Sequence, residues 1–101
     1  MSSTGIFSQE YDLDKTVLSK NVIKEKCDRE LLIIRNEIYA RHGYVFSNEM
    51  LSDYFNSQHW YKPIADNKQI KLNKTEEENI ALISIEEGSR KDKYKAIDNY
   101  F

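Results

Sequence analysis

The chain of 101 residues is poor in the residues that make turns, with three glycines and one proline. An all-β sandwich needs a turn about every 8 to 12 residues, so this composition argues against one and favours helices joined by short loops. A chain of this length has room for one domain with a modest core, which excludes a multidomain enzyme. The expected fold is all-α, a small compact bundle of three to five helices.

Long apolar runs and an excess of one charge are also missing. Apolar runs such as residues 31–34 are far shorter than the roughly 18 residues of a membrane span, so we expect no membrane insertion of this chain. Fifteen Lys and Arg residues face 17 Asp and Glu residues, which leaves a net charge of −2. Because no strong positive field results, and local lysines are flanked by acidic residues, nucleic acid is not an expected partner.

The residues that hold metals and phosphates are scarce. Cys27 is the only cysteine, which excludes an internal disulfide and an all-cysteine metal site. A zinc site needs three or four ligands, and the two histidines, His42 and His59, occur without any metal-binding motif. The glycines lie far apart at positions 5, 43 and 88, so a phosphate-binding loop is absent. We expect no metal and no other cofactor.

The strongest helix signal covers residues 29–42. Asp28 can cap the N-terminus through its carboxylate, and Gly43 can adopt the left-handed conformation that ends a helix. Glu37 and Arg41 form an i,i+4 pair on one face. A wide apolar arc predicts a central helix that packs on more than one side. One stripe of this arc carries Leu31, Ile34, Ile38 and His42.

Weaker patterns predict the neighbouring helices. Residues 12–26 have apolar spacings compatible with one kinked or two short amphipathic helices. Ser47 is a good N-cap for a short helix that ends at Phe55. The inward face of that helix is expected to carry Met50, Leu51, Tyr54 and Phe55.

The C-terminal part begins with a long loop. Residues 56–73 contain the Trp-Tyr-Lys-Pro sequence and a weak extended signal at residues 69–72. Asn73 and Glu76 have the spacing of a capping box, which predicts a helix over residues 75–87 that stops at Gly88.

These patterns predict a single domain over residues 12–88. Residues 1–11 are then a flexible N-terminus or a remnant of cloning. Residues 89–101 form a charged and aromatic tail with helical spacing, which could dock on the domain or join two copies into a homo-oligomer. The apolar positions of this tail are Tyr94, Ile97, Tyr100 and Phe101.

Aromatic residues are concentrated in the middle of the chain. Seven of the twelve lie between positions 39 and 61, interleaved with arginine, histidine and asparagine. Such polar groups need hydrogen bonds or ion pairs when they lie beside apolar rings. The rings are either core, which we favour because aromatic stripes usually reflect area burial, or the lining of a cleft for a peptide or sugar chain. The candidate ligand- or partner-binding residues are Arg35, Arg41, His42, Tyr44, His59 and Tyr61.

Several short motifs resemble the signature of the YARHG domain. The family name is spelled by residues 39–43, after the Arg-Asn-Glu-Ile of residues 35–38. Residues 51–55 resemble the family's leucine and Tyr-Phe helix, residues 60–63 its Trp-Tyr-Lys-Pro loop, and residues 78–80 its closing helix, so that the likeness covers residues 18–87. The motif residues to which we assign structural roles are Asn36, Ile38, Tyr39, Ala40, Gly43, Tyr54, Phe55, Trp60, Pro63, Asn79 and Ile80.

Within the motif, Gly43 is expected to end the helix, Ala40 to allow close approach of another element, and Tyr39 with Trp60 to clamp the following loop. The resemblance implies a bacterial, extracytoplasmic module with no established activity. We therefore predict a noncatalytic binding or interaction module of a cell-envelope or secreted protein, whose partner is a protein or a cell-wall glycan or peptide.

Two alternatives belong to other classes. The first is an intracellular adaptor or regulator of a protein partner, with a cytoplasmic location, because the first five residues lack the basic and apolar stretches of a signal peptide. The second is a small hydrolase with His42 or His59 as general base, for which the sequence offers no nucleophile motif.

Overall fold

The computed structural model describes residues 12–98, with side chains as far as residue 91. The four helices in this part are α1 (Lys20–Glu25), α2 (Asp28–Ala40), α3 (Glu49–Asn56) and α4 (Lys74–Asp98), with a short 3₁₀ helix, η2 (Asn67–Gln69), before α4. No strand occurs between residues 12 and 98, so the all-α prediction is confirmed. None of these helices is long and apolar enough to cross a membrane.

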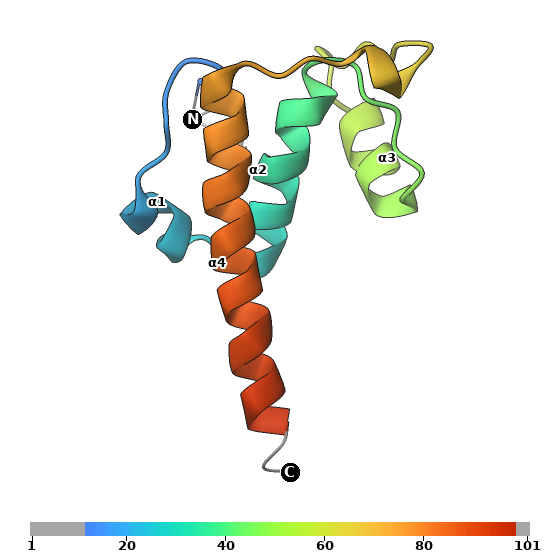
Figure 1. Cartoon of the computed structure of the whole chain (residues 1–101). Coiled ribbons are helices and arrows are strands. Elements are labelled where there is room, and N and C mark those ends of the chain that lie inside the picture. The colour runs from blue at the N-terminus through green and yellow to red at the C-terminus, as the bar shows by residue number, and fades with distance from the viewer. Residues whose placement is uncertain (1–11, 99–101) are drawn as a thin grey trace, which may run out of the picture.

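Helix α2 lies at the centre, with α4 and α1 on one side and α3 on the other (Figure 1). On the α4 side, Leu31, Ile34 and Ile38 are buried in one core with Ile83. On the α3 side, Ile33 and Ala40 are buried in a second core with aromatic residues that include Phe55. The predicted central position of this helix is confirmed, because apolar residues cover both sides of it.

The segment before α1 is mostly non-helical, so the expectation of one or two helices over residues 12–26 is correct only for Lys20–Glu25. The side chain of Asn79, which is fully buried in α4, explains the difference. Its amide nitrogen donates to the carbonyls of Leu13 and Thr16 at 3.0 and 2.9 Å, and its oxygen accepts the N–H of Leu18 at 2.8 Å. These backbone groups are therefore bound across the domain rather than within a local helix.

Two predicted N-caps are each wrong by one residue. Cys27 precedes α2, and its N–H donates to Glu30 Oε1 at 2.8 Å, so Asp28 is the first helical residue. Asn48 caps α3, because its side-chain oxygen accepts the N–H of Leu51 at 3.0 Å. The side chain of Asn48 is long enough to reach the N–H three residues later, and Ser47 lies outside the helix. Met50 is 37% exposed and lies at the edge of the predicted inward face rather than in it.

Gly88 does not end the last helix, contrary to the prediction. The only described glycine with a positive φ is Gly43, and α4 continues through Gly88 to Asp98. An ion pair between Arg90 and Glu86, with N–O distance 2.9 Å, spans Gly88 on one helical face. Arg90 also donates to Asp28 at 2.8 Å, at the start of α2. These contacts fix the helix beyond the glycine.

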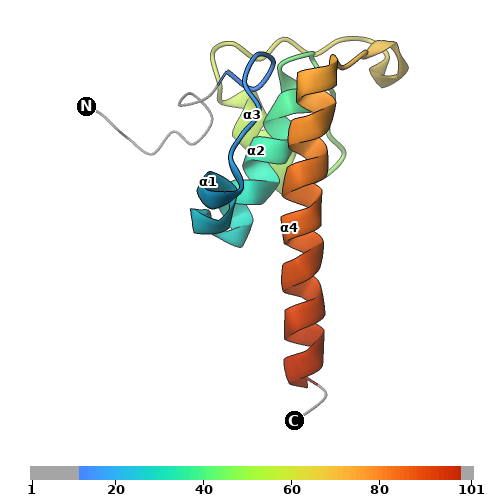
Figure 2. The ribbon, with the colours of Figure 1, turned by 60° about the vertical axis from the view of Figure 1, so that its left-hand side comes forward.

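The C-terminal half of α4 projects past the other helices in both views (Figures 1 and 2). The predicted boundary between residues 12–88 and 89–101 therefore lies inside a continuous helix. The four apolar tail positions that could join two copies, and residues 1–11, lie outside the part whose side chains are described.

Gly43 ends α2 as predicted, with φ of +90°. Its carbonyl accepts the N–H of Ile64 at 2.9 Å, which brings the loop after Pro63 against the turn. A Cβ at this position would lie 2.5 Å from the carbonyl oxygen of Lys62. Both the backbone conformation and the close approach therefore require glycine here.

We expect Gly43→Ala to lower the free energy of unfolding by at least about 2 kcal/mol. The substitution forces alanine into a left-handed backbone conformation, and its Cβ also clashes with the backbone of Lys62. Gly88→Ala is the matched control, since no atom lies within 4 Å of the added Cβ. It should stabilise the protein by about 0.5 to 1 kcal/mol, as alanine favours a helix interior. Urea denaturation followed by circular dichroism measures both. Equal stability of the Gly43→Ala variant and the wild type would contradict this account.

Candidate functional site

Arg35 fixes the contact between α2 and α4. Its Nε donates to Glu87 Oε1 at 2.7 Å and its Nη2 to Glu87 Oε2 at 3.4 Å. Both side chains are partly exposed, so this pair contributes at most about 1 kcal/mol to stability. Asn36, next to it, donates to the carbonyl of Leu32 in its own helix.

Arg41 connects α2 to the loop after α3. Its Nε donates to Glu37 Oε2 at 2.9 Å, so the predicted i,i+4 pair is confirmed. The guanidinium carbon lies 3.8 Å from the centre of the Trp60 ring, a cation–π contact. Tyr39, expected to clamp the loop with Trp60, instead places its ring edge-on against Tyr44 at 5.6 Å.

His42 connects the end of α2 to the start of α4. Its Nε2 lies 2.7 Å from Glu76 Oε2. The other carboxylate oxygen of Glu76 accepts the N–H of Asn73 at 2.8 Å, and Asn73 Oδ1 accepts the N–H of Glu76 at 2.8 Å. The capping box predicted from the spacing of Asn73 and Glu76 is therefore confirmed, and both oxygens of Glu76 are engaged.

A hollow of about 420 Å³ lies between the ends of α2 and α4 and the segment at residues 12–14. We name it the acidic hollow, because carboxylates outnumber cationic groups in its lining. Its titratable residues are Asp12, Asp14, Glu37, Arg41, His42 and Glu76. Arg41 and His42 are the two predicted site residues that the fold brings together here.

Glu37 is the most unusual group of the acidic hollow. It is only 1% exposed, and its Oε1 accepts no hydrogen bond from any group that the structure describes. Burial raises the pKa of Glu37 above its ordinary value of 4.5, and the hydrogen bond and charge of Arg41 oppose this effect. The net rise means that the fold disfavours the ionised carboxyl even with Arg41 beside it.

A second surface lies on the opposite face of α2. Residues advance by about 100° along a helix, so Tyr39 lies about 200° from Glu37. Two hollows, of about 460 and 390 Å³, are both lined by Tyr39 and Tyr44. We name this surface the tyrosine groove. Its other lining residues include Asn67, Lys71 and Glu77 in the first hollow, and Arg35, Asn36, Phe46 and Asn48 in the second.

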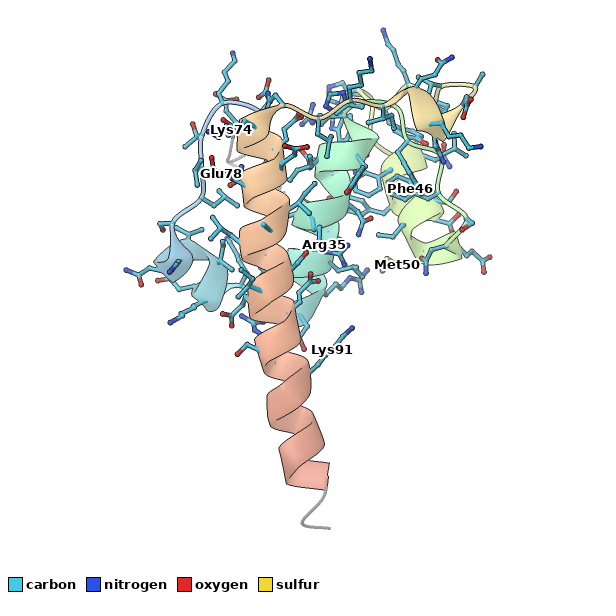
Figure 3. The ribbon with its side chains drawn as sticks, in the orientation of Figure 1. Arg35, Phe46, Met50, Lys74, Glu78 and Lys91 are labelled. Carbon is cyan, nitrogen blue, oxygen red and sulfur yellow. The ribbon has the colours of Figure 1, made fainter. Side chains whose placement is uncertain are left out.

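Aromatic contacts hold the tyrosine groove in place. The hydroxyl of Tyr61 donates to the carbonyl of Tyr44 at 2.6 Å, and the Tyr44 ring lies 4.9 Å from that of Phe46. Phe46 stacks in turn on Phe55, at 5.0 Å between centres. Figure 3 shows Phe46 on the side of α2 that faces α3.

The predicted site residues therefore do not form one surface. Arg41 and His42 line the acidic hollow, Arg35 and Tyr44 line the tyrosine groove, and Tyr61 supports Tyr44 from behind. His59 is exposed in the loop after α3.

Of the residues with predicted structural roles, most are placed in the two cores or their edges. Ile38 and Ala40 are buried, Ile80 and Trp60 pack against the cores, and the Tyr54 ring contacts that of Phe55 at 4.9 Å. Pro63 is exposed in its loop.

Sequence reasoning missed the carboxylates of the acidic hollow as a group. Glu37 has the spacing of a surface ion pair, and only its position between the apolar residues Ile34 and Ile38 indicates burial. Asp12 and Asp14 join the hollow through the contacts of Asn79, which no local pattern predicts. Among residues 12–91 no group of three or more His, Cys, Asp or Glu side chains is placed to hold a metal ion.

The fold and its motifs define a small all-α domain built around one central helix. The pattern of the YARHG domain matches residues 6–87, which is most of the chain. The chain belongs to the YARHG domain family. No curated protein and no solved structure matches it.

We expect Glu37→Gln to raise the free energy of unfolding at neutral pH, because the folded pKa of Glu37 lies above the unfolded one. The native state then binds this proton more tightly, so its stability falls as pH rises from the ordinary glutamate range through the raised folded pKa. Glutamine removes this loss of stability. The free energies of unfolding of the variant and the wild type should become equal at about pH 4. Urea denaturation across this pH range measures the difference.

Glu78→Gln provides the control, since Glu78 is an exposed carboxylate on α4 beyond the acidic residues of its first turn. Its effect should stay within about 0.5 kcal/mol at every pH. A Glu37→Gln variant that is clearly less stable than the wild type at neutral pH would show that the Arg41 pair outweighs the cost of burial.

Proposed function

We propose that the chain is a noncatalytic binding module that holds a cell-wall glycan strand in the tyrosine groove. The observation that carries this proposal is that Tyr39 and Tyr44 line both hollows. A ligand that crosses both hollows must be longer than one residue and must pass over these rings. An extended polymer satisfies both conditions.

The lining of the groove suits a sugar chain. Binding sites combine apolar and aromatic surface with a few polar groups that fix orientation. Half-buried tyrosine rings offer flat apolar faces with polar tips, and the flanking amides and charges of Asn36, Asn67 and Lys71 offer hydrogen-bonding partners for hydroxyl groups.

The groove is also held in shape before any ligand binds. The Tyr44 N–H donates to the carbonyl of Tyr39 at 3.2 Å, and Tyr61 fixes the Tyr44 carbonyl. A rigid groove loses little conformational freedom on binding, which favours affinity.

The arrangement of the reactive side chains supports a role without catalysis. Cys27 and His42 lie beyond opposite ends of the 13 residues of α2, so about 20 Å separates them. His42 is bonded to Glu76, whose other oxygen is occupied by the cap of α4. The Nε2 of His42 is therefore bonded to the residue that caps α4, which fits a structural role for this ring.

Isothermal titration of the full chain with a β-1,4-linked N-acetylglucosamine tetramer tests the glycan proposal. We expect saturable binding by the wild type and at least about a tenfold loss for Tyr44→Ala, equivalent to about 1.4 kcal/mol. Val45→Ala is the matched control, because Val45 is the exposed neighbour of Tyr44 and does not line the groove.

Binding by Val45→Ala should stay within twofold of the wild type, and circular dichroism should show both variants folded. An absence of binding by the wild type, or full binding by folded Tyr44→Ala, would contradict the proposal.

The proposal includes a location at a bacterial cell envelope, which is supported by the family resemblance of the motifs. We expect the natural full-length gene product to fractionate with the envelope or the culture medium. Immunoblots of cell fractions measure this, with a cytoplasmic enzyme as the control. Recovery only in the cytoplasmic fraction would favour the intracellular adaptor instead.

A further inference from the structure

The acidic hollow lies on the face of α2 that the proposed glycan does not use. Its volume of about 420 Å³ is in the range of small-ligand sites. It is large enough for one side chain or one sugar unit rather than a polymer. The hollow therefore requires its own explanation.

The charges in the lining determine what could enter. Glu37, Glu76, Asp12 and Asp14 supply four carboxylates, against one guanidinium and one imidazole. Glu37 accepts a hydrogen bond from the Nε of Arg41, and Glu76 is paired with the Nε2 of His42. Asp12 and Asp14 are exposed and add negative charge at the rim. An anionic ligand would meet this excess of negative charge, whereas a cation would be attracted.

An independent feature of Glu37 points to the type of cation. The Oε1 of this buried side chain accepts no hydrogen bond among the described residues, although Glu37 lines the hollow. Glu76, the other buried carboxylate, has both oxygens engaged. A buried acceptor without a donor is costly, so a ligand that brings an N–H group recovers free energy there.

We infer that the acidic hollow binds a primary ammonium group, which donates a hydrogen bond to Glu37 Oε1 and is further attracted by Asp12 and Asp14. An ammonium group is a compact charge with three donors, which fits one buried acceptor without a hydrogen bond and two rim carboxylates. The direction of the Glu37 pKa shift agrees, because a bound cation would stabilise the carboxylate that burial disfavours. Two sources carry this chemistry, a lysine-type side chain and an amino sugar.

The test is a titration of the full ¹⁵N-labelled chain followed by NMR. The probes are Nα-acetyl-lysine methylamide and glucosamine, each compared with its N-acetylated counterpart, in which the ammonium charge is removed. We expect saturable shifts at the amides of Glu37, Arg41 and Glu76 with at least one amine, and at least tenfold weaker binding of its acetylated form. The amine that saturates identifies the source.

Three variants assign the effect to the hollow. Glu37→Gln keeps the size of the side chain and should weaken amine binding at least tenfold. Asp14→Asn, at an exposed position that leaves the fold intact, should weaken it at least twofold. Glu78→Gln is the matched control, since Glu78 is an exposed carboxylate on α4 that lines neither the acidic hollow nor the tyrosine groove, and it should leave amine affinity unchanged.

Three results would overturn the inference. They are the absence of saturable shifts with either amine up to about 10 mM, equal binding of the acetylated probes, and equal losses in Glu37→Gln and Glu78→Gln, which would indicate nonspecific attraction. The outcome is separate from that of the glycan proposal, because Tyr44→Ala should leave amine binding intact and Glu37→Gln should leave glycan binding intact.

Discussion

The fully buried carboxamide of Asn79 is the contact on which the arrangement of the domain depends. It joins α4 to a segment more than 60 residues away through three hydrogen bonds. A non-helical segment that packs on a helix needs partners for its backbone groups, and a side chain with both donors and an acceptor can supply them to both N–H and C=O groups. The same bonds place Leu13 in the core, and so put Asp12 and Asp14 at the rim of the acidic hollow.

Helix α2 makes two different surfaces possible because it is covered from two sides. Its face toward α4 carries the apolar stripe and, at its end, the ion pairs of the acidic hollow. Its other face packs on α3 and carries Tyr39 into the tyrosine groove. Gly43 then reverses the chain so that Tyr44 returns to lie beside Tyr39, at 5.6 Å between ring centres. One helix and one turn therefore position residues of both surfaces.

Local patterns predicted the features that depend on local physics. The helix predicted over residues 29–42 is found at Asp28–Ala40. It follows from periodicity, and the turn at Gly43 and the capping box of Asn73 follow from backbone conformation and from side chains that bond nearby backbone. The predicted stop at Gly88 was wrong because Arg90 bonds Glu86 across the glycine and Asp28 at the start of α2, and the second contact has no local signal. The burial of Glu37 could not be read from its spacing to Arg41, since a surface pair and a buried pair have the same spacing.

The family motif at residues 39–43 is a structural junction, and this explains why it identifies the fold better than the ligand. Arg41 covers Trp60 of the Trp-Tyr-Lys-Pro loop, His42 bonds the start of α4, and Gly43 accepts a hydrogen bond from the residue after Pro63. Because these side chains are committed to neighbouring elements, little of the motif is free to choose a ligand. In the proposed binding roles, selectivity therefore depends on groups outside the motif, which are the rim carboxylates of the acidic hollow and the flanking polar residues of the tyrosine groove.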